Sequence, residues 1–101
     1  MQIVETEERI QVPDAAQATA TPLIETERLR ALLLNLAAGQ SVGPCEMATV
    51  VLYYVIKGQG HLRVGDEPTS VREGSLALVP AGAVRSVFAD EPMRVLAVQV
   101  L

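Results

Sequence analysis

The stretch ATVVLYYVI, from Ala48 to Ile56, decides the fold of this 101-residue chain. Six of the seven residues from Val50 to Ile56 are β-branched or aromatic, and such side chains pack better on a pleated sheet than on a helix. The run stops at KGQG, residues 57–60, where two glycines permit a turn or a bulge. We therefore predict a buried strand at the centre of a sheet.

On both sides of this stretch, short apolar segments alternate with turns rich in glycine and proline. The segments Leu23–Glu25 and Leu29–Leu36 predict a hairpin, although the leucine-rich second arm also has helical propensity. A loop is expected over residues 37–44. Further strands are expected at residues 61–64, 69–72, 76–79, 84–89 and 94–101. Many short strands at regular spacing indicate an all-β sandwich or barrel.

The N-terminal region differs from the rest of the chain in composition. Residues 1–11 alternate weakly and predict a lone strand or an arm, whereas residues 13–22 are small and polar and predict a linker. A chain of this length builds one core. We therefore expect a single domain over residues 1–101, with an arm and linker at 1–22 and a barrel at 23–101.

Charge and cysteine content narrow the function classes. The net charge is −4 and the eight basic residues are scattered, so nucleic-acid binding is not expected. The sole cysteine, Cys45, excludes an internal disulfide and fits a reducing compartment. The N-terminus is charged where a signal peptide would be apolar, and the longest apolar run, Val50–Ile56, is too short to span a bilayer. We expect a cytoplasmic protein with no membrane partner.

Two glycine-framed stretches carry a family resemblance. Gly39 and Gly58 frame the first, which ends in YVIKGQG at residues 54–60, and Gly74, Pro80 and Gly82 stand at the spacing of the second. Both resemble the motifs of the cupin superfamily of small β-barrels. The resemblance implies an all-β, cupin-type double-stranded β-helix, also called a jelly-roll barrel.

The family's metal-ligand positions are substituted in this sequence. The two histidine positions of the first motif hold Cys45 and Met47, its glutamate position holds Val51, and the histidine position of the second motif holds Arg85. The family's usual metal site is therefore not carried over, and no cofactor is expected. An alternative is a transition metal held through Cys45, because sulfur ligands suit a soft ion such as Cu(I).

Residue parity predicts which side chains would face the barrel interior. Odd-numbered residues of one strand point to the same face, and on the later strand Arg85 shares a face with Val87 and Ala89. We expect a ligand-binding cavity lined by Cys45, Met47, Thr49, Val51, Tyr53 and Arg85.

Arg85 is the most informative of these residues, and three interpretations are open. Its guanidinium could reach the barrel mouth and extend into water. It could bind a ligand carboxylate or phosphate, because a buried cation needs a partner. It could also pair internally with Glu46 or another acid.

The remaining reactive side chains give weaker evidence for a binding or catalytic role. Cys45 and Met47 could be ordinary apolar lining residues, and Cys45 as a nucleophile would need a neighbouring base. The only histidine, His61, is expected to face away from the interior.

The apolar residues that alternate with the cavity set predict an interface. We expect Ala48, Val50, Leu52, Tyr54 and Ile56 to point outward, where a second copy of the chain would cover them in a homodimer. The function that we expect is metal-independent binding of a small, anionic molecule in the barrel. The alternatives are a divergent cupin enzyme (an isomerase or a dioxygenase-like protein) and a degenerate barrel that serves dimerisation or partner binding.

Overall fold

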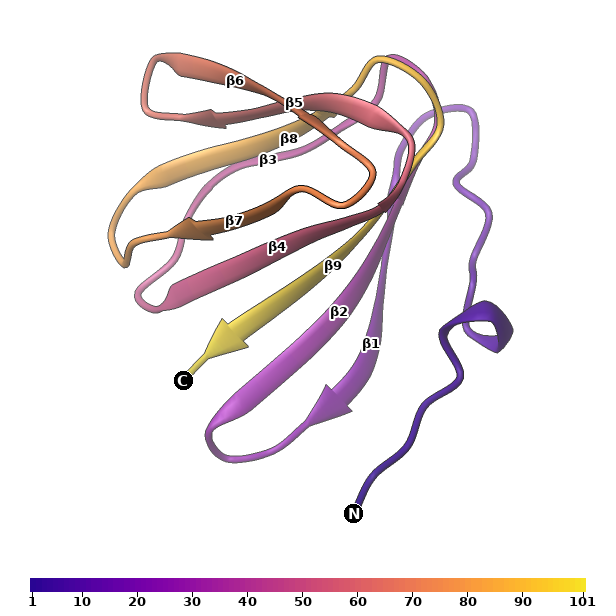
Figure 1. Cartoon of the computed structure of the whole chain (residues 1–101), viewed down its shortest axis with the longest axis vertical. Coiled ribbons are helices and arrows are strands. Elements are labelled where there is room, and N and C mark those ends of the chain that lie inside the picture. Colours follow the sequence, from indigo (N-terminus) through magenta and orange to yellow (C-terminus); the bar gives the residue numbers. More distant parts are fainter.

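The computed structural model describes residues 1–101, which form two antiparallel sheets that face each other (Figure 1). A short 3-10 turn, η1 (Thr6–Glu8), precedes the strands. The strands are β1 (Thr19–Glu25), β2 (Leu29–Leu36), β3 (Ser41–Glu46), β4 (Val50–Lys57), β5 (Gln59–Val64), β6 (Glu67–Arg72), β7 (Leu76–Val79), β8 (Val84–Ala89) and β9 (Met93–Val100).

The strand order confirms the predicted jelly-roll barrel. One sheet has the order β1-β2-β9-β4-β7, and the facing sheet has the order β3-β8-β5-β6. From β2 to β5 and again from β7 to β9, each connection carries the chain from one sheet to the other, so the chain winds as a double-stranded β-helix. No helix is long and apolar enough to cross a membrane.

The strand predicted at the centre of a sheet is β4, which pairs with β9 on one side and β7 on the other. Val51, Tyr53 and Val55 are buried, whereas Tyr54, which points the opposite way, is 41% exposed. The period-2 pattern of the sequence is therefore confirmed along this strand.

The barrel interior is filled by side chains from both sheets. Twelve buried residues form one cluster in which Tyr53 is the only aromatic member. They are Leu34, Leu36, Val51, Tyr53, Val55, Leu62, Val79, Val87, Ala89, Met93, Val95 and Ala97. Burying each large aliphatic side chain contributes about 1.5–3 kcal/mol, so this cluster is the main stabilising feature of the fold.

Two boundaries differ from the sequence-based expectation. β1 begins at Thr19 rather than Leu23, because Thr19–Pro22 pairs with Leu32–Asn35 of β2. Pro22 is tolerated there because β1 is an edge strand and a missing N–H is harmless on its free side. β3 begins at Ser41, inside the segment that was expected to be a loop.

The first residues form an arm and not a strand. Arg9 donates to the carbonyl of Pro22 at 2.8 Å, and Thr19 Oγ1 donates to the carbonyl of Gln11 at 2.7 Å. Arg94 Nη1 lies 3.1 Å from Glu7 Oε1. Since Arg94 is on the outer face of β9, these contacts hold the arm against the outside of its own sheet.

The motif residue Gly58 adopts a backbone conformation and a close contact that favour glycine. Its φ is +86°, and a Cβ built on it would lie 2.1 Å from the carbonyl oxygen of Pro92. Gly65 also has a positive φ, +62°, but a Cβ there would meet no atom within 4 Å. We expect Gly58→Ala to lower the free energy of unfolding by about 1–3 kcal/mol more than Gly65→Ala, because only the former adds a clash. Chemical denaturation measures both, and equal losses would contradict the close approach.

Candidate functional site

Arg85 lies inside the barrel on β8. Arg85, Val87 and Ala89 are 1%, 3% and 0% exposed, whereas Val84 and Phe88 on the opposite face of the strand are 46% and 41% exposed. The predicted inward face of this strand is therefore confirmed. Arg85 has the largest of the fully buried side chains.

The Arg85 guanidinium donates hydrogen bonds to two backbone carbonyls. Nε donates to the carbonyl of Ala83 at 2.9 Å, and Nη2 donates to the carbonyl of Pro80 at 3.1 Å. The third nitrogen, Nη1, is buried and has no hydrogen-bond partner. The turn after β7, which carries the second glycine motif, thus orients the side chain without neutralising its charge.

Two of the three interpretations of Arg85 are wrong in this structure. The side chain does not extend into water, because it is 1% exposed. It forms no internal ion pair, because the ion pairs of the chain are Arg30–Glu25, His61–Asp90 and Arg94–Glu7. Glu46, the suggested partner, lies exposed at the end of β3. A cation without a carboxylate therefore lies in the barrel interior.

Tyr53 is the polar neighbour of Arg85 on the facing sheet. Burial raises the pKa of its phenol above 10.0, and the nearby Arg85 guanidinium offsets this effect only in part. The phenol therefore stays neutral at physiological pH and keeps a proton that it can donate.

Thr49 contributes a second unsatisfied polar atom at this end of the barrel. Its Oγ1 is buried without a hydrogen-bond partner, like Arg85 Nη1. Thr49 belongs to the turn between β3 and β4, and the N–H of Gly82 donates to the carbonyl of Met47 in that turn at 2.8 Å. This bond ties the Thr49 turn to the turn that holds Arg85.

Cys45 and Met47 do not lie on the same strand as Val51 and Tyr53, as the parity argument assumed. Cys45 lies on β3, and Met47 lies in the following turn, because the chain reverses between Glu46 and Val50. Cys45 nevertheless pairs with Arg85 across the antiparallel strands, so both project to the same side of the sheet. Cys45 is exposed because β3 is the edge strand of its sheet, and Met47 is half-buried.

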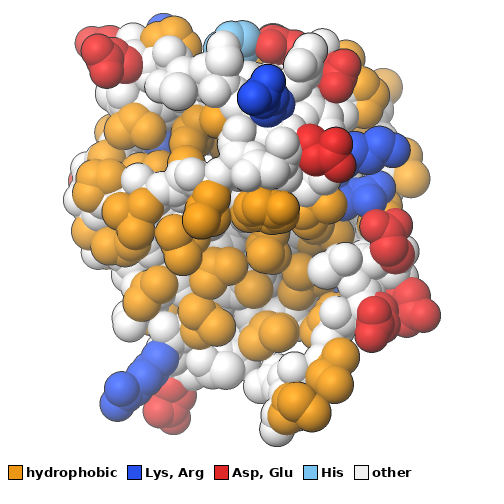
Figure 2. Space-filling view, in the orientation of Figure 1, with side chains coloured by type: hydrophobic (Ala, Val, Ile, Leu, Met, Phe, Trp, Pro, Cys, Tyr) orange, Lys and Arg blue, Asp and Glu red, His pale blue; other side chains and the backbone are white.

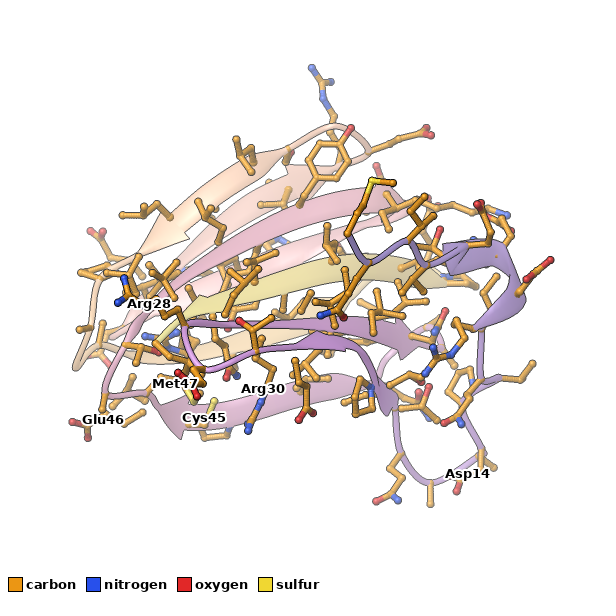
Figure 3. All side chains as sticks on the ribbon, turned by 90° about the horizontal axis from the view of Figure 1, so that it is seen from below. Asp14, Arg28, Arg30, Cys45, Glu46 and Met47 are labelled. Carbon is orange, nitrogen blue, oxygen red and sulfur yellow. The ribbon has the colours of Figure 1, made fainter.

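Two inward-facing polar residues were missed by the sequence analysis. Gln99 pairs with Val51 on one side and with Arg30 on the other, so all three share the inner face of their sheet. Gln99 is 9% exposed and the Arg30 side chain 46% exposed, 3.9 Å from Glu25. Figure 3 shows Arg30 pointing from β2 toward β3, near Cys45. The alternation of β9 could have identified Gln99, but the leucine run of β2 conceals the orientation of Arg30.

No open cavity joins the six predicted site residues. The internal cavity has a volume of only about 10 Å³ and is lined by apolar residues such as Tyr53, Val55 and Val87. This space holds one water molecule at most. Of the six predicted residues, Tyr53 alone lines this space, and no other cavity is lined by any of them. Val51, Tyr53 and Arg85 nevertheless face the interior.

The residues at the family's metal positions do not fit a divalent metal ion. Val51 has no donor atom, and Arg85 is a cation that would repel the ion. Cys45 and Met47 are the two remaining positions, and no group of three or more His, Cys, Asp and Glu lies together. His61 faces outward as predicted, with its Nδ1 3.2 Å from Asp90 Oδ2.

Solved structures of other proteins share this fold over nearly the whole chain. The protein TT1209 of Thermus thermophilus is 25% identical, with a TM-score of 0.90 over 99% of this chain and 97% of that one. An RmlC-like cupin of Desulfovibrio desulfuricans is 20% identical, with a TM-score of 0.86 over 99% and 96%. An uncharacterized double-stranded β-helix protein of Klebsiella pneumoniae is 19% identical, with a TM-score of 0.87 over 99% and 90%.

The sequence comparison gives the same assignment. No protein with a curated description is significantly similar to this chain. The model of the cupin domain family matches residues 33–99, which include every strand from β3 to β8. This chain therefore belongs to the cupin domain family.

Proposed function

We propose that this protein is a metal-independent binding module that holds a small anion inside its barrel through Arg85. The observation that carries the proposal is the fully buried guanidinium, which has two carbonyl contacts, one free nitrogen and no carboxylate partner. A buried charge without a counter-charge costs several kcal/mol. A carboxylate or phosphate oxygen at Nη1 would supply the missing charge and hydrogen bond.

The neighbouring side chains suit an oxyanion. Tyr53 has a neutral phenol, and the Thr49 hydroxyl is buried without a partner. Both hydroxyls can donate to an anion whose other oxygen lies at Arg85 Nη1. Three of the six residues predicted to bind the ligand therefore receive roles. Arg85 is the charged anchor, and Thr49 and Tyr53 are hydrogen-bond donors.

Figure 3 shows Cys45 and Met47 together at one end of the barrel. We expect a ligand to reach Arg85 from this end, because Cys45 pairs with Arg85 across the strands. Arg30 also lies on this side, but Glu25 at 3.9 Å offsets its charge, so Arg85 is the charged anchor of the proposed site. Because no cavity surrounds Arg85, a ligand needs a side chain to move, and we expect the half-buried Met47 to be that side chain. A flexible thioether side chain suits such a movable cover, and the limited space favours a small ligand.

An enzyme is the alternative, and Cys45 is its best candidate residue. Cys45 is exposed and pairs with Arg85 across the strands. However, no histidine or carboxylate accompanies it on the inner face to serve as a base. A barrel that serves only dimerisation or partner binding is the third possibility, and it predicts no small-molecule binding at all. A cytoplasmic location suits each of these functions and the unpaired cysteine.

We also propose that the protein is a homodimer through the outer face of the sheet containing β4. Hydrophobic side chains gather over this face (Figure 2). Leu76 and Leu78 of β7 are 67% and 63% exposed, and the neighbouring Tyr54 is 41% exposed. The outward residues of β4 from Val50 to Ile56 include no charge, so two copies can meet face to face without like-charge repulsion.

The anion site predicts a specific loss of binding. We expect at least one small carboxylate or phosphate to bind with one-to-one stoichiometry in calorimetric titrations at constant ionic strength. Arg85→Met removes a charge-assisted hydrogen bond and should weaken that binding at least about 10-fold. Arg63→Met, which removes an exposed arginine from β5, is the matched control. Equal affinity in the Arg85 variant would refute the assignment.

The interface predicts the mass in solution. Sedimentation equilibrium should give twice the chain mass of 10.8 kDa for the natural protein. Leu78→Lys places a charge in the centre of the face and should give the single-chain mass, whereas Phe88→Lys on the facing sheet should not. A natural protein that sediments as one chain would exclude the dimer.

A further inference from the structure

A larger cavity lies at the opposite end of the barrel from Arg85. It has a volume of about 330 Å³ and opens between the N-terminal arm and the ends of the strands. Its lining includes Ile10 and Val12 of the arm, Asn35 and Leu36 at the end of β2, Lys57 at the end of β4, and Arg94 near the start of β9. We call this cavity the arm groove. Its volume is in the range of small-molecule sites.

Asn35 leaves one hydrogen-bond donor unsatisfied in the wall of the groove. The residue is 5% exposed, and its Oδ1 accepts from Arg94 Nε at 3.3 Å. Its Nδ2 is buried and has no partner. A buried donor without an acceptor is destabilising, so the site favours a ligand that brings an acceptor atom.

The charges of the groove leave an excess of one positive charge. Arg94 Nη1 is paired with Glu7 at 3.1 Å. Lys57 forms none of the ion pairs of the chain. The remaining charge calls for a ligand with a single negative charge, and the acceptor that Asn35 lacks can be an oxygen of the same group.

The rest of the groove is apolar, because Ile10, Val12 and Leu36 contribute aliphatic side chains. The arm that supplies two of them is fixed on both sides of the groove. Arg9 donates to Pro22 at 2.8 Å before it, and Gln40 Nε2 donates to the carbonyl of Asp14 at 2.7 Å after it. The apolar wall is therefore part of the folded protein.

We propose that the arm groove binds a monocarboxylic acid with an apolar body. The carboxylate accepts from Asn35 Nδ2 and pairs with Lys57, and the apolar body packs against Ile10, Val12 and Leu36. The proposal is independent of the Arg85 site, because the two sites lie at opposite ends of the barrel and share no residue.

Hexanoate and benzoate are suitable probes, with hexanol as the uncharged control. Methyl chemical shifts in a titration followed by NMR should change saturably at Ile10, Val12 and Leu36, and hexanol should bind at least about 10-fold more weakly than hexanoate.

Two variants test the polar contacts of the groove. Lys57→Met removes an exposed charge. Asn35→Asp keeps the side-chain shape and the oxygen that accepts from Arg94, but it replaces the unpartnered Nδ2 donor with a negatively charged oxygen. Each should weaken hexanoate at least about 10-fold, and Arg63→Met should leave it unchanged.

The groove assignment fails on any of three results. These are no saturable binding of either acid, binding that both groove variants leave unchanged, and shift changes confined to residues outside the groove. Circular dichroism of the variants confirms that a loss of binding does not come from unfolding.

Discussion

The barrel encloses a positive charge among aliphatic side chains, and the anion site that we propose rests on this charge. Arg85 is 1% exposed, and its neighbours on the inner face of β8 are Val87 and Ala89. Two backbone carbonyls satisfy two of its three nitrogens, so the desolvation cost is reduced but not removed. A protein under selection for stability alone would place an aliphatic residue here. This cost is the reason for our proposal that an anion enters the barrel.

The cupin framework makes such a buried charge tolerable. The turn from Pro80 to Ala83 supplies the carbonyls, and the turn between β3 and β4 is fastened to it through Gly82 and Met47. The resemblance implies that metal ligands occupy the positions of Cys45, Met47, Val51 and Arg85 in the family's motifs. Arg85 holds the position of a metal-binding histidine in the second motif, so this chain carries a positive side chain where the motif implies a metal ligand.

The fold could be predicted from local patterns because those patterns report which face of a strand is buried. The alternation of β4 and β8 placed Val51, Tyr53 and Arg85 in the interior correctly. The assumption of one strand from Cys45 to Tyr53 was wrong, because the turn between Glu46 and Val50 is not visible as a break in the pattern. Cys45 still projects to the side of Arg85, whereas Met47 lies in the turn. The inward Arg30 was concealed by the uniform leucines around it. The arm groove could not be predicted either, since it joins residues from four segments that meet only in the folded chain.

The unfolding free energy of Arg85→Met in the absence of organic anions distinguishes a charge kept for binding from a structural arginine. Chemical denaturation of the natural protein and the variant, in dilute buffer with chloride as the only anion, gives the difference. If Arg85 is an uncompensated charge kept for binding, the variant should be as stable as the natural protein within about 1 kcal/mol, or more stable. A loss of more than about 3 kcal/mol would mean that Arg85 is a satisfied structural residue and not an anchor for an anion.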